Sequence, residues 1–236
     1  MAESSTAAVA ANIFVSPGEA FAAIKERPRA WLPLLVLLAA QATVSLVYMS
    51  NVDLAWMFET QLEAAGAELT QAQREEALTA ATNISPTVYG AIGAVSSSIF
   101  ILVIFFCVSL YYTGISFATN DGIKLKQWFG FACWCALPTV LGILAGLVNI
   151  VAGDARFMMQ EEINPLSFAN LFSIDTTDAS ILQRILAGLD LTWIWSMVLS
   201  VIGYQAWTDR SIAKSAVIVL GPLAVIVAIG TLLTLP

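Results

Sequence analysis

The sequence contains no histidine, and only 11% of its 236 residues are charged. Soluble domains are about a quarter charged. This low charge content, with 58% hydrophobic residues, excludes a soluble domain on a single anchor and indicates several membrane spans. The ten basic residues do not form the kind of cluster that binds nucleic acid, so we expect no nucleic-acid partner.

Ionisable residues are missing from the interior of all five long apolar runs. Acidic, basic and histidine side chains inside a membrane mark proton relays and ion paths, so their absence argues against a proton-driven transporter. It also leaves Ser96, Ser97 and Ser98 without the base that a serine nucleophile needs. We therefore assign these serines to helix packing, and we predict no catalytic residue and no enzymatic activity.

Cysteine is scarce, and Cys107, Cys133 and Cys135 all fall within apolar runs. A metal site needs thiolates and a further ligand. Because Cys133 and Cys135 lie two residues apart, they point to different faces of a helix. The sequence therefore predicts neither a metal nor a cofactor, and we interpret the cysteines as small apolar packing residues.

The apolar runs are long enough to cross a bilayer, for which a helix needs roughly 17–25 residues. They cover residues 31–50, 86–117, 127–152, 191–207 and 215–235. The fold class predicted from them is an all-α, polytopic integral membrane protein with five transmembrane helices. On this interpretation residues 1–30 are an N-terminal segment, and residues 31–236 are the membrane domain.

The distribution of charge predicts the orientation. Seven of the ten basic residues lie in the N-terminal segment and in the turns at 118–126 and 208–214, together with five of the 17 acidic residues. The other two connections hold three basic and twelve acidic residues. Because basic residues gather on the cytoplasmic side, we place the N-terminus in the cytoplasm and the C-terminus outside. A bacterial inner (cytoplasmic) membrane is the expected location.

The N-terminal segment is predicted to contain one amphipathic helix. Residues 1–13 are small and polar, and we expect them to be disordered. Ser16, Pro17 and Glu19 then form a capping pattern that starts a helix leading to the first span.

One side of this helix is apolar with basic flanks, which suits the headgroup layer of a bilayer. The predicted membrane-interface anchors are Phe21, Ile24, Lys25, Arg27, Arg29 and Trp31. The alternative interpretation is an ordinary amphipathic helix that packs on its own protein, since an apolar strip suits either surface.

Two of the connections are long enough to hold structure of their own. Residues 51–85 predict two short amphipathic helices, separated by Gly66 and with a capping box at Thr70. Residues 153–190 are unusually apolar for a loop. We expect both connections to pack on the bundle or to lie in the membrane surface.

Proline and glycine predict the irregular points of the spans. Pro138 is expected to kink the third span and Pro222 to bend the fifth. Gly142 and Gly146 form a small-x-x-x-small pattern, which lets membrane helices approach closely.

Three stretches resemble the Yip1 family of small membrane proteins, of the bacterial type. They are SPGEAFAAIKERPRAWLPLL from Ser16, FGFACWCALP from Phe129, and WIWSMVLSVIGYQAWTDRSIAKSAVIVL from Trp193. Their order and spacing across the spans carry the resemblance. It implies this family's fold and topology, an accessory role beside transporters, and no catalytic residues.

The expected function is that of a non-enzymatic, multi-pass accessory or scaffold protein that acts on other membrane proteins or lipids. Its expected partners are the lipid bilayer and other membrane proteins, including a transporter complex. The alternative is a transporter of a lipid or small molecule through the helix bundle, because kinks at Pro138 and Pro222 beside small residues would open a cavity.

Overall fold

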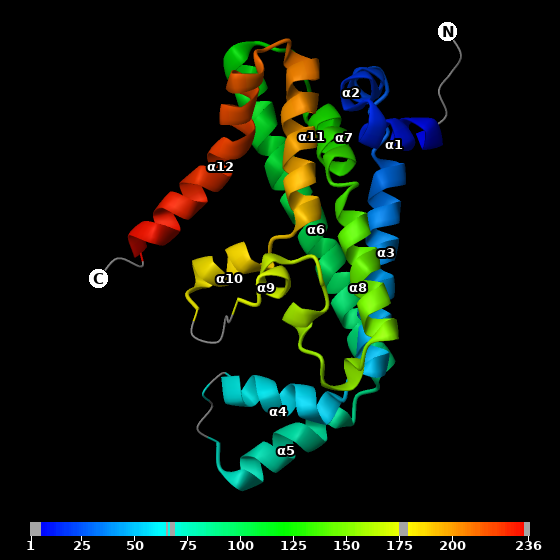
Figure 1. Cartoon of the computed structure of the whole chain (residues 1–236), viewed down its shortest axis with the longest axis vertical. Helices are drawn as coiled ribbons and strands as arrows, with labels where there is room; N and C mark the ends of the chain where they lie inside the picture. The colour runs from blue at the N-terminus through cyan, green and yellow to red at the C-terminus, as the bar shows by residue number, and fades with distance from the viewer. Residues whose placement is uncertain (1–5, 65, 67–68, 175–178, 234–236) are drawn as a thin grey trace. The chain divides into compact units, whose positions relative to one another are not determined.

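The computed structural model describes residues 6–64, 66, 69–174 and 179–233, and within these ranges the chain is helical, as predicted (Figure 1). Twelve α-helices and two short 3-10 helices follow one another along the described chain. A single isolated bridge pairs Ser167 with Asp190.

The helices coincide closely with the predicted spans. They are α3 (Trp31–Asn51), α6 (Pro86–Thr119), α7 (Leu125–Cys135), α8 (Thr139–Ala152), α11 (Leu191–Thr208) and α12 (Ile212–Leu233). Among the described residues, α3, α6 and α12 are each long and apolar enough to cross a membrane, and α7 with α8 makes a fourth candidate. The chain therefore has three or four candidate spans on length and composition, and α11 is not among them.

The third predicted span is broken rather than continuous. The helices α7 and α8 are bent by 41° relative to each other at a short break, and Pro138 is the last residue before α8 begins. Proline lacks the amide hydrogen that a helix requires, and its ring collides with the preceding turn. The break thus lies where the sequence predicts a kink.

The described helices group into two compact units. The first unit comprises Met1–Leu37, Ile101–Gly142 and Leu166–Pro236, and the second comprises Leu38–Phe100 and Ile143–Pro165. Three helices, α3, α6 and α8, continue from one unit into the other.

In the first unit the chain starts with two helices, α1 (Thr6–Val15) and α2 (Pro17–Glu26). The expectation that residues 1–13 are disordered is wrong for residues 6–13, while residues 1–5 lie outside the described ranges. Ile13 on α1 is fully buried in the core of this unit, and that burial stabilises a helix whose sequence lacks charge. Pro17 starts α2 as predicted, but the Ser16 side chain makes no capping hydrogen bond.

The first unit also holds the second half of the apolar outer connection. Two short helices, α9 (Phe168–Leu171) and α10 (Ile181–Gly188), precede α11. The amide of Phe168 donates to the carbonyl of Leu189 over 2.8 Å, which ties this segment to the start of α11.

The second unit contains the two predicted loop helices, α4 (Leu54–Ala64) and α5 (Gln71–Thr82). Both hydrogen bonds of the predicted capping box at Thr70 are present, and Gly66 adopts the left-handed conformation with φ +61°. That conformation favours glycine because it has no Cβ. The prediction for this connection is therefore confirmed at its break and at its cap.

The rest of the outer connection in this unit is η1 (Ala155–Phe157), η2 (Gln160–Glu162) and the residues up to Pro165. The Tyr48 hydroxyl donates to the carbonyl of Met158 over 2.9 Å, and the Asn149 amide donates to the carbonyl of Glu162 over 2.9 Å. These bonds hold the connection against α3 and α8. The connection packs on the protein, which is one of its two predicted placements.

Candidate functional site

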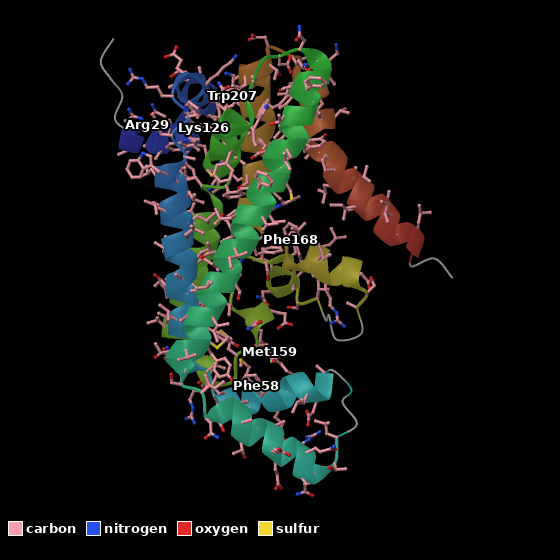
Figure 2. The ribbon with its side chains drawn as sticks, turned by 180° about the vertical axis from the view of Figure 1, so that it is seen from behind. Arg29, Phe58, Lys126, Met159, Phe168 and Trp207 are labelled. Carbon is pink, nitrogen blue, oxygen red and sulfur yellow. The ribbon has the colours of Figure 1, made fainter. Side chains whose placement is uncertain are left out.

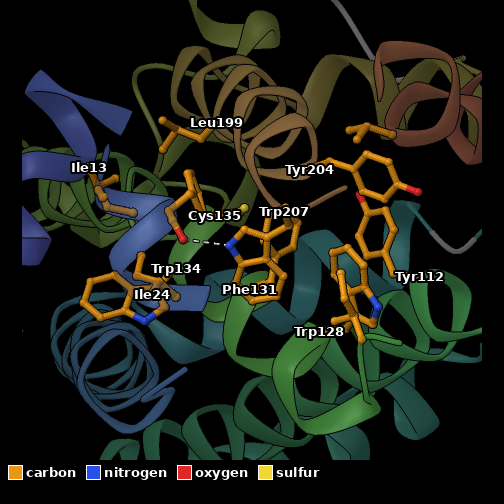
Figure 3. Close-up of a cluster of buried hydrophobic side chains, with 14 residues drawn as sticks. Ile13, Ile24, Tyr112, Trp128, Phe131, Trp134, Cys135, Leu199, Tyr204 and Trp207 are labelled. Atoms are coloured by element: carbon orange, nitrogen blue, oxygen red, sulfur yellow. Dashed lines mark hydrogen bonds between the residues drawn. The ribbon is translucent and has the colours of Figure 1, made fainter. Parts of the chain in front are cut away.

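Six aromatic rings in the first unit contact one another and form what we call the aromatic cluster. Its members are Phe21 (α2), Tyr112 (α6), Trp128 and Phe131 (α7), and Tyr204 and Trp207 (α11). Neighbouring ring centroids lie 4.9–5.6 Å apart. Figure 3 labels five of these rings, Tyr112, Trp128, Phe131, Tyr204 and Trp207, and shows them grouped together. Rings at such distances contribute beyond the area they bury, about 0.5–1.5 kcal/mol per pair.

The indole N–H groups in and beside this cluster all have acceptors. Trp207 Nε1 donates to the carbonyl of Phe21 over 2.8 Å, which Figure 3 marks as a dashed line. Trp128 Nε1 donates to Ser116 Oγ over 3.0 Å, and Trp134 Nε1 donates to the carbonyl of Arg29 over 3.1 Å. Two of the three bonds therefore end on the N-terminal segment and hold its backbone against α7 and α11.

Two glycines make room for the N-terminal segment. A Cβ atom at Gly203 of α11 would lie 2.7 Å from Phe131 Cε2 and 2.8 Å from two ring atoms of Phe21. A Cβ at Gly130 of α7 would lie 3.1 Å from Pro28 Cβ. A Cβ at Gly203 therefore requires one of the two rings to move, and a Cβ at Gly130 requires a small shift of Pro28.

A basic residue completes the attachment of α2. Lys25 Nζ donates to the carbonyl of Trp207 over 2.6 Å, next to the C-terminus of α11. The last carbonyls of a helix lack intrahelical donors and carry partial negative charge, so a lysine is well suited to this position. The α2 helix thus contacts α11 through a ring, an indole hydrogen bond and an ammonium group.

An ion pair joins the turn that follows α6 to the turn that follows α11. Arg210 Nη2 lies 2.9 Å and 3.0 Å from the two carboxylate oxygens of Asp121, and Arg210 Nη1 donates to the Tyr204 hydroxyl over 2.9 Å. Thr119 Oγ1 also donates to Asp121 over 2.7 Å. Both charged side chains are mostly buried, at 18% and 14% exposure. This charge-assisted pair, in which one guanidinium nitrogen contacts both carboxylate oxygens, fixes the turn after α6 to the turn after α11.

Replacing Arg210 with lysine should therefore destabilise the protein although it keeps the charge. Lysine offers one ammonium group and cannot pair with two oxygens and Tyr204 in this geometry, so we expect a loss of about 1–2 kcal/mol. Thermal unfolding of the purified protein measures this loss. The control is Arg74→Lys, because the pairs of Arg74 with Glu59 and Glu63 are much more exposed and should contribute less than about 1 kcal/mol. Equal melting temperatures for the two variants would contradict the structural role of the Arg210 pair.

The family is established by comparison with known sequence families. The Yip1 domain matches residues 11–233, which is nearly the whole chain. The chain belongs to the Yip1 family. No curated protein and no solved structure matches it. Proteins of the Yip1 family are generally non-enzymatic membrane proteins, and the resemblance predicted from the three sequence stretches is thereby confirmed.

The three stretches that carry the family resemblance supply most of the aromatic cluster. The stretch from Phe129 to Pro138 contains Gly130, Phe131 and Trp134, and the stretch from Trp193 contains the Gly203-Tyr204 pair and Trp207. Together with Phe21 of the first stretch, these residues bring the three motifs into contact within one unit.

Two of the predicted anchors in the Yip1 chain are buried in the protein. Phe21 and Ile24 are 0% and 2% exposed and belong to the core cluster. Their side chains pack on the protein, as the alternative interpretation expects, and Gly203 and Phe131 offer a closely fitting surface. A position of α2 at the membrane interface stays a prediction.

The other four predicted anchors are Lys25, Arg27, Arg29 and Trp31, of which Figure 2 labels Arg29. Lys25 is half-buried and bonds to α11, whereas Arg27 and Arg29 are exposed. Trp31 is 54% exposed at the first residue of α3. For these residues a position at the membrane interface stays a prediction.

The packing and kink residues lie in different surroundings. Gly142 is buried, and a Cβ at Gly146 would lie 3.1 Å from Ile163 Cγ2, so Gly146 faces the outer connection rather than another span. Pro222 lies inside α12, which continues through it, so the predicted bend there stays a prediction. Pro138 adjoins the break described above.

Several residues that the site depends on have no distinct signal of their own in the sequence. In the sequence, Gly203 and Trp207 are parts of a longer stretch, and Asp121 and Arg210 are two charges in two separate turns. For Gly203, Trp207 and Arg210 the available signal was their place in the stretch from Trp193, and Asp121 lies outside all three stretches.

Proposed function

We propose that this Yip1 protein is a non-enzymatic accessory protein that binds another integral membrane protein through α12. Its first unit supplies a closed aromatic core that holds α2, α7 and α11 together. Two features of the chain suit a structural role. The indole N–H groups of the core donate to acceptors within the protein. The predicted spans carry no acidic, basic or histidine residue that would serve as an acid or base.

The observation that carries the proposal is the exposed face of α12. The first turns of α12 are attached to the unit, because Ser215 and Val219 are buried and the Tyr111 hydroxyl donates to the carbonyl of Ile218 over 2.7 Å. Its C-terminal half stands apart from α11 in both Figure 1 and Figure 2. The large exposed side chains there are Val225, Ile226, Ile229 and Leu232. An exposed, uncharged apolar face of this kind can pack on a helix of another membrane protein.

Site-specific photocrosslinking in intact membranes tests this role. A benzophenone side chain at Ile226 or Ile229 is expected to yield a discrete protein adduct. The matched control is the same group at Val95, an exposed apolar residue of α6, where only lipid adducts are expected. Lipid adducts alone at all three positions would contradict a partner on α12.

A second candidate function is transport of a lipid or small molecule. The observation that favours it is the helix break at Pro138, because broken helices line the substrate paths of many transporters. Purified protein in sealed vesicles should not move fluorescent phospholipids between leaflets if the accessory role is right. Movement that depends on the protein would establish the transporter instead.

We further propose five spans, with α11 as the fourth, in a bacterial inner membrane. At 18 residues α11 is about 27 Å long, close to the roughly 30 Å of a hydrocarbon core. Its tryptophans and serines lower its hydropathy, but the Ser196 and Ser200 hydroxyls are buried and donate to the carbonyls of Thr192 and Ser196. They therefore expose no unpaired hydroxyl to lipid.

Five spans with a cytoplasmic N-terminus require the C-terminus to lie outside. A phosphatase fused after Pro236, which is active only outside the cytoplasm, is expected to be active, and a fluorescent protein that folds only in the cytoplasm is expected to be dark. The control is the same pair of fusions after Gly122, between α6 and α7, where the opposite result is expected. A cytoplasmic C-terminus would mean that α11 or another helix does not cross.

A further inference from the structure

A hollow of about 470 Å³ lies beside the turn that joins α11 to α12. It is lined by Arg210, Ala213, Lys214, Val217 and Ile218. After Arg210 these residues follow at three- and four-residue steps, so they share one side of the first turns of α12. The lining is basic at the turn and apolar further along the helix, and a hollow of this volume can hold a small ligand or part of a lipid.

The two basic residues of the hollow differ in their surroundings. Arg210 is held in place by Asp121 and Tyr204, and the carboxylate of Asp121 balances its charge. Lys214 is exposed, and no described acidic residue forms an ion pair with it. Asp209, exposed at the end of α11, is the other charged residue of this turn. Lys214 is thus the cation that remains to receive an anion.

We propose that this hollow binds the phosphodiester group of an anionic phospholipid. Because α12 enters the membrane from this turn, Lys214 lies near headgroup level, and Ile218 lies four residues, or about 6 Å, further along the helix. The Lys214 ammonium contacts the phosphate, and the first part of an acyl chain lies on Val217 and Ile218. Val217 is 73% exposed, so the contact surface is open to a lipid.

The choice of a phospholipid over a free phosphate compound follows from the lining. A water-soluble phosphate would leave Val217 and Ile218 uncovered, whereas a lipid covers them while its phosphate meets Lys214. A net negative headgroup is favoured over a zwitterionic one, because the cationic group of a zwitterionic headgroup is repelled by Lys214. The site is separate from the proposed partner surface, which lies in the C-terminal half of α12.

Native mass spectrometry of the purified full chain in mild detergent tests the site. Phosphatidylglycerol, phosphatidylcholine and glycerol phosphate are titrated separately against the wild type, Lys214→Ala and Lys126→Ala. Lys126 is an exposed lysine of α7 that does not line the hollow. Lys126→Ala therefore removes the same charge as Lys214→Ala, but outside the proposed site. We expect phosphatidylglycerol to bind the wild type and Lys126→Ala equally, and Lys214→Ala about fivefold more weakly.

Three outcomes would overturn the proposal. If phosphatidylglycerol binds Lys214→Ala as tightly as the wild type, Lys214 is not the cation that contacts the phosphate. Equal losses of affinity in both lysine variants indicate non-specific electrostatic attraction. If phosphatidylcholine or glycerol phosphate binds as tightly as phosphatidylglycerol, the hollow is not specific for an anionic phospholipid. Thermal unfolding of each variant is measured in parallel, and the exposed Lys214 is expected to leave the melting temperature unchanged.

Discussion

Replacing Phe21 with alanine is expected to lower the free energy of unfolding by about 3–5 kcal/mol, the usual range for a fully buried phenylalanine. The side chain is 0% exposed and its ring centroid lies 5.3 Å from that of Phe131. Its loss leaves a cavity between α2, α7 and α11 and weakens the attachment of the whole N-terminal segment. Thermal unfolding followed by tryptophan fluorescence reports the loss, at roughly 2–4 °C per kcal/mol for a chain of this size.

The control for this variant is Phe117→Ala. Phe117 lies near the end of α6 and is 90% exposed, so the same substitution removes no packed ring and should change the melting temperature little. If Phe21→Ala melts within a degree or two of Phe117→Ala, the aromatic cluster does not hold the N-terminal segment.

Replacing Gly203 with valine is expected to have the second-largest effect. Its Cβ would lie under 3.0 Å from atoms of both Phe21 and Phe131, and these rings are enclosed by the rest of the aromatic cluster. Overpacking of a filled core costs about 1–3 kcal/mol. Because α2 lies in the N-terminal segment, outside the candidate membrane spans, we expect it to be the element that moves away. Faster proteolytic cleavage within residues 6–30 measures that movement independently of the melting temperature.

Gly114→Val is the matched control for the Gly203 variant. Gly114 also lies inside a helix, α6, and a Cβ there meets no atom within 4 Å. Both substitutions place a β-branched residue in a helix, so the difference between them isolates the collision with the two rings. Equal cleavage rates and equal melting temperatures for the two variants would show that α2 does not pack closely against Gly203.

Most of the helical architecture could be predicted from the sequence because its causes are local. Uncharged runs determine where spans lie, and the capping box at Thr70 and the glycine at position 66 determine where a surface helix starts and where another ends. Pro138 marks the break in the third run for the same local reason.

The burial of α2 could not be predicted in this way. Phe21 and Ile24 form an apolar strip that suits either a lipid headgroup layer or a protein surface, and periodicity does not distinguish the two. The choice is made by residues far away in sequence, since Gly203 and Phe131 form the complementary surface. The helix α1 was missed for a related reason, because Ile13 is stabilised by burial in the same core rather than by local sequence.

The candidate site was visible in the sequence only as a family resemblance. Its stretches contain the tryptophans and glycines that meet in the structure, but the contacts among them join residues separated by up to 186 positions, as between Trp207 and Phe21. The Arg210–Asp121 pair has the same character, because its members lie on two different turns. A count of charges in each turn predicts the orientation, but it does not reveal that two of them form an ion pair.

The central claim is that the aromatic cluster holds the N-terminal helix α2 against α7 and α11. The alternative is that α2 lies in the headgroup layer without a fixed contact to the rest of the protein. Spin labels at Ala22→Cys and Ser211→Cys, both exposed positions, in a Cys107→Ser background, test it by electron–electron distance measurement in lipid nanodiscs. The account predicts one narrow distance distribution that broadens when Phe21→Asp is added. A broad distribution in the parent protein, unchanged by Phe21→Asp, would contradict it.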